Sequence, residues 1–176
     1  MVKKISHKKS SSEKFLSVFD YDNNRNYRFV IQDGKSLKML DSKLNTVKGF
    51  KRNKLNSDIK FPIKHVRILN KDYLLLVSKN NKPLILDRRG NIRIKLPENL
   101  TTSTNHLYEN DGGIITINDL NQLVRIELNG KISSKQLPDQ KNIIHSNKDN
   151  LIVLSNGKIT INNTDYKIPF GDFDDL

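Results

Sequence analysis

The chain has no cysteine, no tryptophan and no alanine among its 176 residues. Without cysteine, neither a disulfide framework nor thiolate ligation of a metal is available, and no redox compartment is selected. Alanine is the best helix former, so its absence, together with abundant asparagine and β-branched residues, disfavours helix and favours turns and strands. The sequence therefore predicts an all-β protein.

Long apolar segments are also missing, since no run approaches the roughly 18 residues of a membrane-spanning helix. Residues 1–14, MVKKISHKKSSSEK, are basic but lack the apolar centre and cleavage site of a signal peptide. We expect them to form a basic disordered tail, and residues 171–176, GDFDDL, to form an acidic tail. The localisation stays unknown: the cytoplasm is the default, and the cell envelope is an option if the chain is a fragment.

Negative charge is comparatively scarce. The chain has 31 Lys and Arg against 19 Asp and Glu, a formal net charge of +12. Nucleic acid, acidic lipid and acidic protein are therefore plausible partners. Coding bias and a basic tail would produce the same excess, so the charge alone does not define a binding face.

A pattern of apolar runs recurs at nearly constant spacing. LLLVS from Leu74, IITIN from Ile114 and LIVLS from Leu151 are 40 and 37 residues apart, and RFVIQ from Arg28 lies 46 residues before the first. An Asn-, Asp- or Gly-rich cluster precedes each run, and a turn signal follows it. A period of this length is typical of stacked supersecondary units.

Each copy holds three evident short runs and a weaker one before the next copy, such as IKHVRIL at 63–69. No copy has apolar residues at helical spacing, and four antiparallel strands at this period describe a β-propeller blade. We predict a β-propeller-like array of about four four-stranded antiparallel blades. Their approximate bounds are 15–60, 61–103, 104–140 and 141–170. A two-sheet sandwich is the alternative.

The pattern D-Y-L-L-V-x-x-x-N-G-x-x-x-x-x-D-x-x-G, seen in DYLLLVSKNNKPLILDRRG from Asp72, resembles the blades of bacterial β-propeller repeat proteins of the quinoprotein-like and WD40-like type. The resemblance covers nearly all of residues 15–170. Such propellers generally have more than four blades. The resemblance therefore implies that this chain is a C-terminal part of a longer propeller, forms a rare four-bladed ring, or pairs with another copy. The tryptophan-rich motifs of quinone-binding members are missing, so no cofactor is expected.

Asp20, Asp22, Asn24 and Asn26 alternate in DYDNNRNY, the spacing of oxygen ligands in a calcium loop. The stretch resembles the Asp-rich loops of FG-GAP propellers, but Arg28 stands where a carboxylate would complete the site. An Asx-rich turn is the favoured interpretation, and we expect no metal here.

Three histidines, His65, His106 and His145, are spaced by 41 and 39 residues, close to the repeat. Their side chains would converge on a metal only if the blades brought equivalent positions together. The register is imperfect and a propeller ring is wide, so hydrogen bonding between blades is the favoured role.

Catalytic motifs are missing: there is no G-x-S-x-G, no H-E-x-x-H and no Gly-rich phosphate loop, so we expect no enzyme and no catalytic residues. Asp87, Arg88 and Arg89 occupy a predicted turn, where exposed ion pairing is the expected role.

The connection between the first two copies, residues 48–65, is the candidate anion-binding segment. Cations that bind phosphate beside aromatic rings that stack on bases suit single-stranded nucleic acid. The rings, Phe50 and Phe61, could equally be apolar plugs of an outer strand. The candidate cations are Lys48, Lys51, Arg52, Lys54, Lys60 and Lys64.

The predicted function is a non-catalytic scaffold or protein-interaction module within a larger chain or assembly, with a protein partner of unknown identity. The alternative is binding of an anionic polymer, such as single-stranded nucleic acid, through residues 48–65. An enzyme with a site at the propeller axis is the least favoured hypothesis. Closing a ring would require further blades or another copy.

Overall fold

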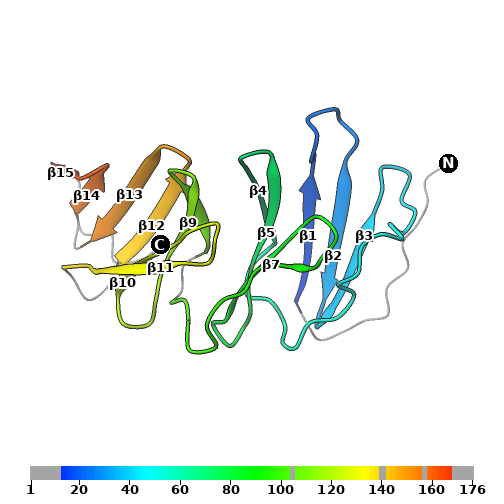
Figure 1. The fold of residues 1–176 in the computed structure, drawn as a ribbon, viewed down its shortest axis with the longest axis horizontal. Coiled ribbons are helices and arrows are strands. Elements are labelled where there is room, and N and C mark those ends of the chain that lie inside the picture. Colours follow the sequence, from blue (N-terminus) through cyan, green and yellow to red (C-terminus); the bar gives the residue numbers. More distant parts are fainter. Residues whose placement is uncertain (1–12, 104–105, 139–141, 156–157, 168–176) are drawn as a thin grey trace. The chain divides into compact units, whose positions relative to one another are not determined.

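The computed structural model describes residues 13–103, 106–138, 142–155 and 158–167. In these ranges the chain forms 15 strands in four antiparallel sheets and no helix that could span a membrane. Figure 1 shows how the strands are arranged. The all-β prediction is confirmed. The predicted tails at 1–14 and 171–176 lie outside the described residues, apart from Glu13 and Lys14, and Lys14 already begins the first strand.

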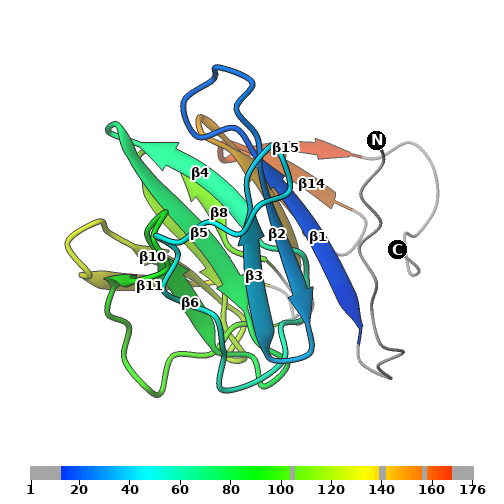
Figure 2. The same ribbon diagram turned by 90° about the vertical axis from the view of Figure 1, so that its right-hand side faces the viewer.

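Sheet order follows chain order, so each sheet is an antiparallel meander. The first sheet consists of β1 (Lys14–Phe19), β2 (Arg28–Asp33) and β3 (Ser36–Leu40), which Figure 2 shows side by side. The second consists of β4 (Lys64–Ile68), β5 (Lys71–Val77), β6 (Pro83–Leu86) and β7 (Ile92–Ile94). The third consists of β8 (Tyr108–Asn110), β9 (Gly113–Ile117), β10 (Gln122–Ile126) and β11 (Ile132–Gln136). The fourth consists of β12 (Asn142–Asn147), β13 (Asn150–Ser155), β14 (Lys158–Ile161) and β15 (Thr164–Lys167).

The recurring apolar runs of the sequence form the second strand of every sheet, namely β2, β5, β9 and β13. The weaker runs become the first strand of the following sheet, because they pair with the strong run after them. His65 lies opposite Leu74, for example, and His145 lies opposite Ile152. Apart from Lys71, β5 and β9 are buried at successive positions, as an inner strand requires.

Two kinds of turn recur at positions rich in Asn, Asp and Gly. In the first kind, two consecutive residues with positive φ join a first strand to a second or a third to a fourth. This geometry is a type I′ hairpin, whose twist matches that of the strands. The pairs are Leu69–Asn70, Asp111–Gly112 and Asn162–Asn163.

The second kind is a five-residue segment in which the first N–H donates to the fifth carbonyl and the fourth N–H donates to the first carbonyl. The fourth residue has positive φ, as a type I turn followed by a G1 bulge requires. When Asp41, Asp87 or Asn118 comes first, its side chain also accepts the N–H groups of the third and fifth residues. The segments are 41–45, 78–82, 87–91, 118–122 and 127–131.

The first sheet has three strands instead of the predicted four, because the chain after β3 only touches the edge of that strand. Thr46 and Lys54 form isolated bridges to Leu40 and Ser36. Between these bridges the segment leaves the edge and reaches the β6–β7 turn, where the Lys51 N–H donates to a main-chain carbonyl. The other three sheets have four strands each, as predicted.

The chain divides into two compact units, residues 1–95 and 96–176, which we call the first and second units. In the first unit the first and second sheets share an apolar core, to which Val30 and Leu74 belong. In the second unit Ile115, Ile117 and Ile144 join the third and fourth sheets. Burying such aliphatic side chains contributes roughly 1.5–3 kcal/mol each.

Candidate functional site

The six candidate cations lie on the connection between β3 and β4 or at the start of β4. Three of them are exposed: Lys48, Lys51 and Lys54. The backbone beneath them is held by hydrogen bonds, including that from the Phe50 N–H to the Val47 carbonyl at 3.1 Å. The connection thus presents three ammonium groups on a fixed stretch of main chain.

The other three candidates, all half-buried, are tied into the first unit. Arg52 donates from Nε to the Gly90 carbonyl at 3.2 Å, and Lys60 donates to Asn81 Oδ1 at 3.0 Å. Burial lowers the pKa of Lys64. These three residues therefore attach the connection to the rest of the first unit, and their charges are less accessible to a ligand than those of the exposed lysines.

The two aromatic residues of the connection are also engaged. Phe50 packs against the core of the first unit, and the Lys60 ammonium lies 5.8 Å from the centre of the Phe61 ring. Base stacking needs an open ring face, which a plug in the core does not offer. Phe50 therefore packs as an apolar side chain, but from the irregular connection and not from an outer strand.

A groove of about 240 Å³ lies between the connection and the second sheet. Its lining includes the buried side chains of Leu55, Ile59 and Leu76, and Arg52 and Lys82 supply positive charge. An apolar base beside cations suits a ligand that carries an apolar group next to a carboxylate or phosphate. This groove could not be predicted from the sequence, because its two walls come from segments that only the fold brings together.

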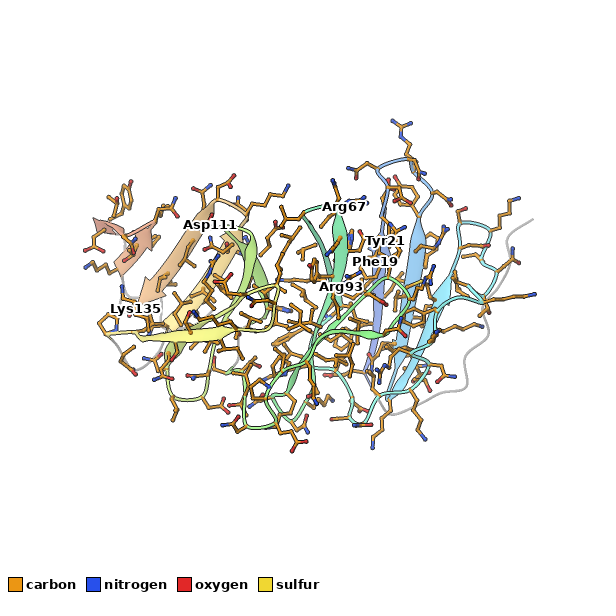
Figure 3. All side chains as sticks on the ribbon, in the orientation of Figure 1. Phe19, Tyr21, Arg67, Arg93, Asp111 and Lys135 are labelled. Carbon is orange, nitrogen blue, oxygen red and sulfur yellow. The ribbon has the colours of Figure 1, made fainter. Side chains whose placement is uncertain are left out.

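A second cluster joins the first sheet to the second through charged side chains. Asp72, which is 5% exposed, lies 2.9 Å from His65 Nε2 and accepts a hydrogen bond from Arg88 Nε at 2.7 Å. Arg88 also donates to Asp22 at 2.8 Å, and Arg67 donates to the Tyr21 carbonyl. Figure 3 labels Arg67 and Tyr21. We call these five side chains, Asp22, His65, Arg67, Asp72 and Arg88, the ion cluster.

Aromatic rings pack beside the ion cluster. The Arg88 guanidinium lies 4.9 Å from the centre of the Tyr21 ring, and the same ring meets His65 edge-on at 4.8 Å. Burial, and after it the negative charge of Asp72, raises the pKa of Tyr21. The hydrogen bond from Arg88 in turn lowers the pKa of Asp22. The negative charges of the two carboxylates and the positive charges of the two guanidinium groups compensate each other. This suits a cluster that holds the first sheet against the second.

The alternating loop DYDNNRNY turns its oxygens toward protein donors. Asp20 accepts the N–H groups of Asn24 and Arg25, and Asn24 accepts the N–H of Asn26. Asn26 accepts a hydrogen bond from Arg28 at 2.8 Å. The loop is an Asx-rich turn, and in the described ranges no three His, Cys, Asp or Glu side chains are grouped as a metal site.

The three histidines have different surroundings. His65 belongs to the ion cluster of the first unit. In the second unit the Tyr108 ring lies edge-on between His106 at 6.2 Å and His145 at 5.2 Å. Aromatic packing therefore accounts for two of them, and pairing with a carboxylate for the third.

The turn at 87–91 lies where the sequence predicts one. Asp87 caps this turn by accepting the N–H groups of Arg89 and Asn91, and the ion pairing comes from Arg88. Arg88 pairs with Asp72 and with a residue 66 positions away, Asp22. The β4–β5 hairpin separately places Arg67 opposite Asp72.

Charge is distributed unequally between the units. Residues 1–95 contain 24 Lys and Arg against eight Asp and Glu, a net charge of +16. Residues 96–176 contain seven against 11, a net charge of −4. The basic character of the chain therefore belongs to the unit that carries the connection and the groove.

Comparison with known proteins finds relatives by structure only, since no family model and no curated protein sequence matches the chain. A catalytically inactive virginiamycin B lyase from Staphylococcus aureus, solved with quinupristin, superposes with a TM-score of 0.58 at 15% identity. The match covers 89% of this chain and 61% of the lyase chain. The fold is β-propeller-like. This chain thus spans less than two thirds of the length of that propeller-like neighbour.

Two further structures match with lower scores. One is a protein of unknown function from Bacteroides caccae, with a TM-score of 0.45, 10% identity and coverage of 76% of this chain and 52% of that one. The other is BBS1N in complex with ARL6DN, with a TM-score of 0.37, 13% identity and coverage of 87% and 67%.

Proposed function

We propose that the protein is a non-catalytic, propeller-like interaction module whose first unit binds an acidic segment of a partner protein. The observation that carries the proposal is the placement of Lys48, Lys51 and Lys54 on a fixed connection whose residues also wall a groove with an apolar base. Acidic segments are attracted to such a surface, and an apolar side chain among the carboxylates would enter the groove.

An acidic protein segment suits this surface better than single-stranded nucleic acid does. Both ligands would use the exposed ammonium groups, but nucleic acid gains much of its affinity from bases stacked on aromatic rings. Phe50 is committed to the core, and Phe61 is partly covered by Lys60. The groove, in contrast, offers aliphatic contacts that a protein side chain can fill.

The ion cluster supports a non-catalytic role. A histidine beside a buried carboxylate resembles a general base with its orienting partner. Here, however, Asp72 also accepts a hydrogen bond from Arg88 and lies 3.7 Å from Arg67. Its negative charge is therefore neutralised by ion pairs that connect the strands. The likeness to a lyase at 15% identity concerns the fold and carries no activity to this chain.

Binding is tested by fluorescence anisotropy with three labelled probes: a Glu/Leu peptide, the matching Gln/Leu peptide and oligothymidylate. We expect the Glu/Leu peptide to bind most tightly, and its affinity to fall as salt screens the charges. Changing Lys48, Lys51 and Lys54 together to Gln should weaken it roughly tenfold, since each exposed pair contributes up to about 1 kcal/mol.

The control in the second unit is Lys131→Gln with Lys135→Gln, which removes two exposed charges where the test variant removes three. This control should leave the affinity unchanged. Tighter binding of oligothymidylate than of the Glu/Leu peptide would overturn the proposal in favour of nucleic acid. Equal loss in the control variant would show that only net charge matters, and would also overturn it.

A further inference from the structure

One face of the first sheet carries exposed and half-buried apolar side chains on β1 and β2, bordered by the exposed Lys14 on β1 and Lys38 on β3. On β1 the side chains of Leu16 and Val18 are 59% and 53% exposed. The register places them beside Ile31 and Phe29 of β2, which are half-buried, so the four form two adjoining rows. The other face of this sheet supplies Val30 to the core of the first unit. Figure 2 shows β1 and β2 next to each other.

One face of the fourth sheet has the same character. Ile143 on β12 and Tyr166 on β15 are 40% and 51% exposed. A single row runs from one to the other across β13 and β14 through Leu154 and Ile159. The other face supplies Ile144 to the core of the second unit.

Both faces are built like the sheet faces that the protein covers itself. Within each unit, rows of aliphatic side chains from one sheet pack on rows from the next. Aligned sheets bury such faces, and a contiguous apolar patch at the surface marks a site of association. Each of the two open faces is therefore suited to pack against another sheet.

Charge indicates which faces pair. Two first units, each with a net charge of +16, repel each other, whereas a first unit attracts a second unit with a net charge of −4. We propose that copies of the chain associate head to tail, the open face of the first sheet of one copy packing on the open face of the fourth sheet of another. This interface is separate from the groove and does not depend on the proposed function.

The experiment is analytical ultracentrifugation of the full chain and of two variants over a range of concentrations. Leu16→Lys with Val18→Lys changes the first-sheet face, and Ile143→Glu with Tyr166→Glu changes the fourth-sheet face. These charges increase the attraction between unlike units, so loss of association reports the loss of apolar contact. Wild-type protein should associate, and each variant alone should be monomeric with at least about a tenfold weaker association.

Mixing the two variants distinguishes head-to-tail pairing from pairing of like faces. Each variant retains the face that the other has lost, so the mixture should form a one-to-one complex. The controls are Leu69→Lys and Leu120→Lys, which place a charge at exposed turn positions away from both faces and should associate like wild type. A monomeric wild-type chain, a variant that still associates alone, or a mixture without complex would each overturn the proposal.

Discussion

The two units join their sheets by different means. In the first unit the ion cluster connects the first sheet to the second, with Asp72 buried at its centre. In the second unit the corresponding bonds are neutral. Ser146 donates to the Glu109 carbonyl at 2.7 Å, and Asn142 donates to Asn121 at 2.8 Å. The same kind of sheet pair is thus secured once by charges and once by uncharged groups.

This difference shows where sensitivity to substitution and acid should lie. A buried ion pair gains little over apolar packing, but removing one partner leaves an uncompensated charge. A neutral hydrogen bond contributes about 1 kcal/mol and leaves a smaller penalty when it is lost. We therefore expect a single substitution between the two sheets to destabilise the first unit more than the second.

Removing the central carboxylate should have the largest effect. Asp72→Ala leaves Arg88 and Arg67 without their buried partner and should lower the free energy of unfolding by about 3 kcal/mol. The second-unit counterpart, Ser146→Ala, should cost about 1 kcal/mol. Chemical denaturation measures both values, and equal losses would contradict the proposed difference between the joints.

Substitution of the glycine at the β6–β7 turn should give the next largest loss of stability. Gly90 has φ +80°, and a Cβ there would lie 2.7 Å from Arg52 Cβ and 2.8 Å from its nitrogen. Gly90→Ala should therefore lower the free energy of unfolding by about 3 kcal/mol or slightly less, because left-handed backbone strain and a steric clash add together.

Gly112 in the second unit is the matched control. It has φ +69° but no neighbour within 4 Å of a Cβ, so Gly112→Ala should cost only about 1–2 kcal/mol. Thermal unfolding of the two variants compares them directly. A larger loss at Gly112 would show that the connection does not press on the β6–β7 turn.

A smaller, stabilising effect is expected at the β4–β5 turn. Leu69 has φ +47° and is 79% exposed, so it meets left-handed strain without burying its side chain. The equivalent turn of the second unit uses Asp111 and Gly112, which suit a type I′ hairpin. Leu69→Asn should raise the free energy of unfolding by roughly 0.5–1 kcal/mol. A decrease would show that Leu69 makes an apolar contact in solution.

The smallest expected effect per group is the response to acid. The pKa values of Asp22, Asp41 and Asp87 lie below the ordinary 3.8. For Asp22 the largest cause is the hydrogen bond from Arg88. A carboxyl whose folded pKa is depressed stabilises the fold above its unfolded pKa and loses that contribution as the pH falls. The first unit should therefore lose stability as the pH drops below about 4.

The second unit provides the contrast, because burial raises the pKa of Glu109 while the hydrogen bond from Lys158 lowers that of Asp165. A raised carboxyl pKa gives stability that is lost as the pH rises, so the two contributions oppose each other. Hydrogen exchange followed during acidification should show the first unit opening earlier. Earlier opening of the second unit would contradict this assignment.

Much of the fold could be predicted because it is encoded locally. The strong runs at Leu74, Ile114 and Leu151 all became second strands, and the Asp, Asn and Gly positions mark turns whose hydrogen bonds close within five residues. Such signals depend on neighbouring residues alone. The grouping into four sheets follows from them.

The parts that could not be predicted depend on contacts between distant segments. The connection at 46–54 has no strand pattern, yet it replaces a fourth strand at the edge of β3. Arg88 meets Asp22 across 66 positions, and the groove forms between the connection and β5. Of the candidate cations, the sequence could not separate the exposed Lys48 from the anchored Lys60, because burial is decided by the folded path.

The decisive experiment for binding by the first unit is hydrogen exchange of the full chain with and without the Glu/Leu peptide. We expect slower exchange in the connection, residues 46–60, and in the β6–β7 turn at 87–91, with the second unit unchanged. Protection confined to the second unit, or no protection at saturating peptide, would contradict the assignment of binding to the cationic first unit.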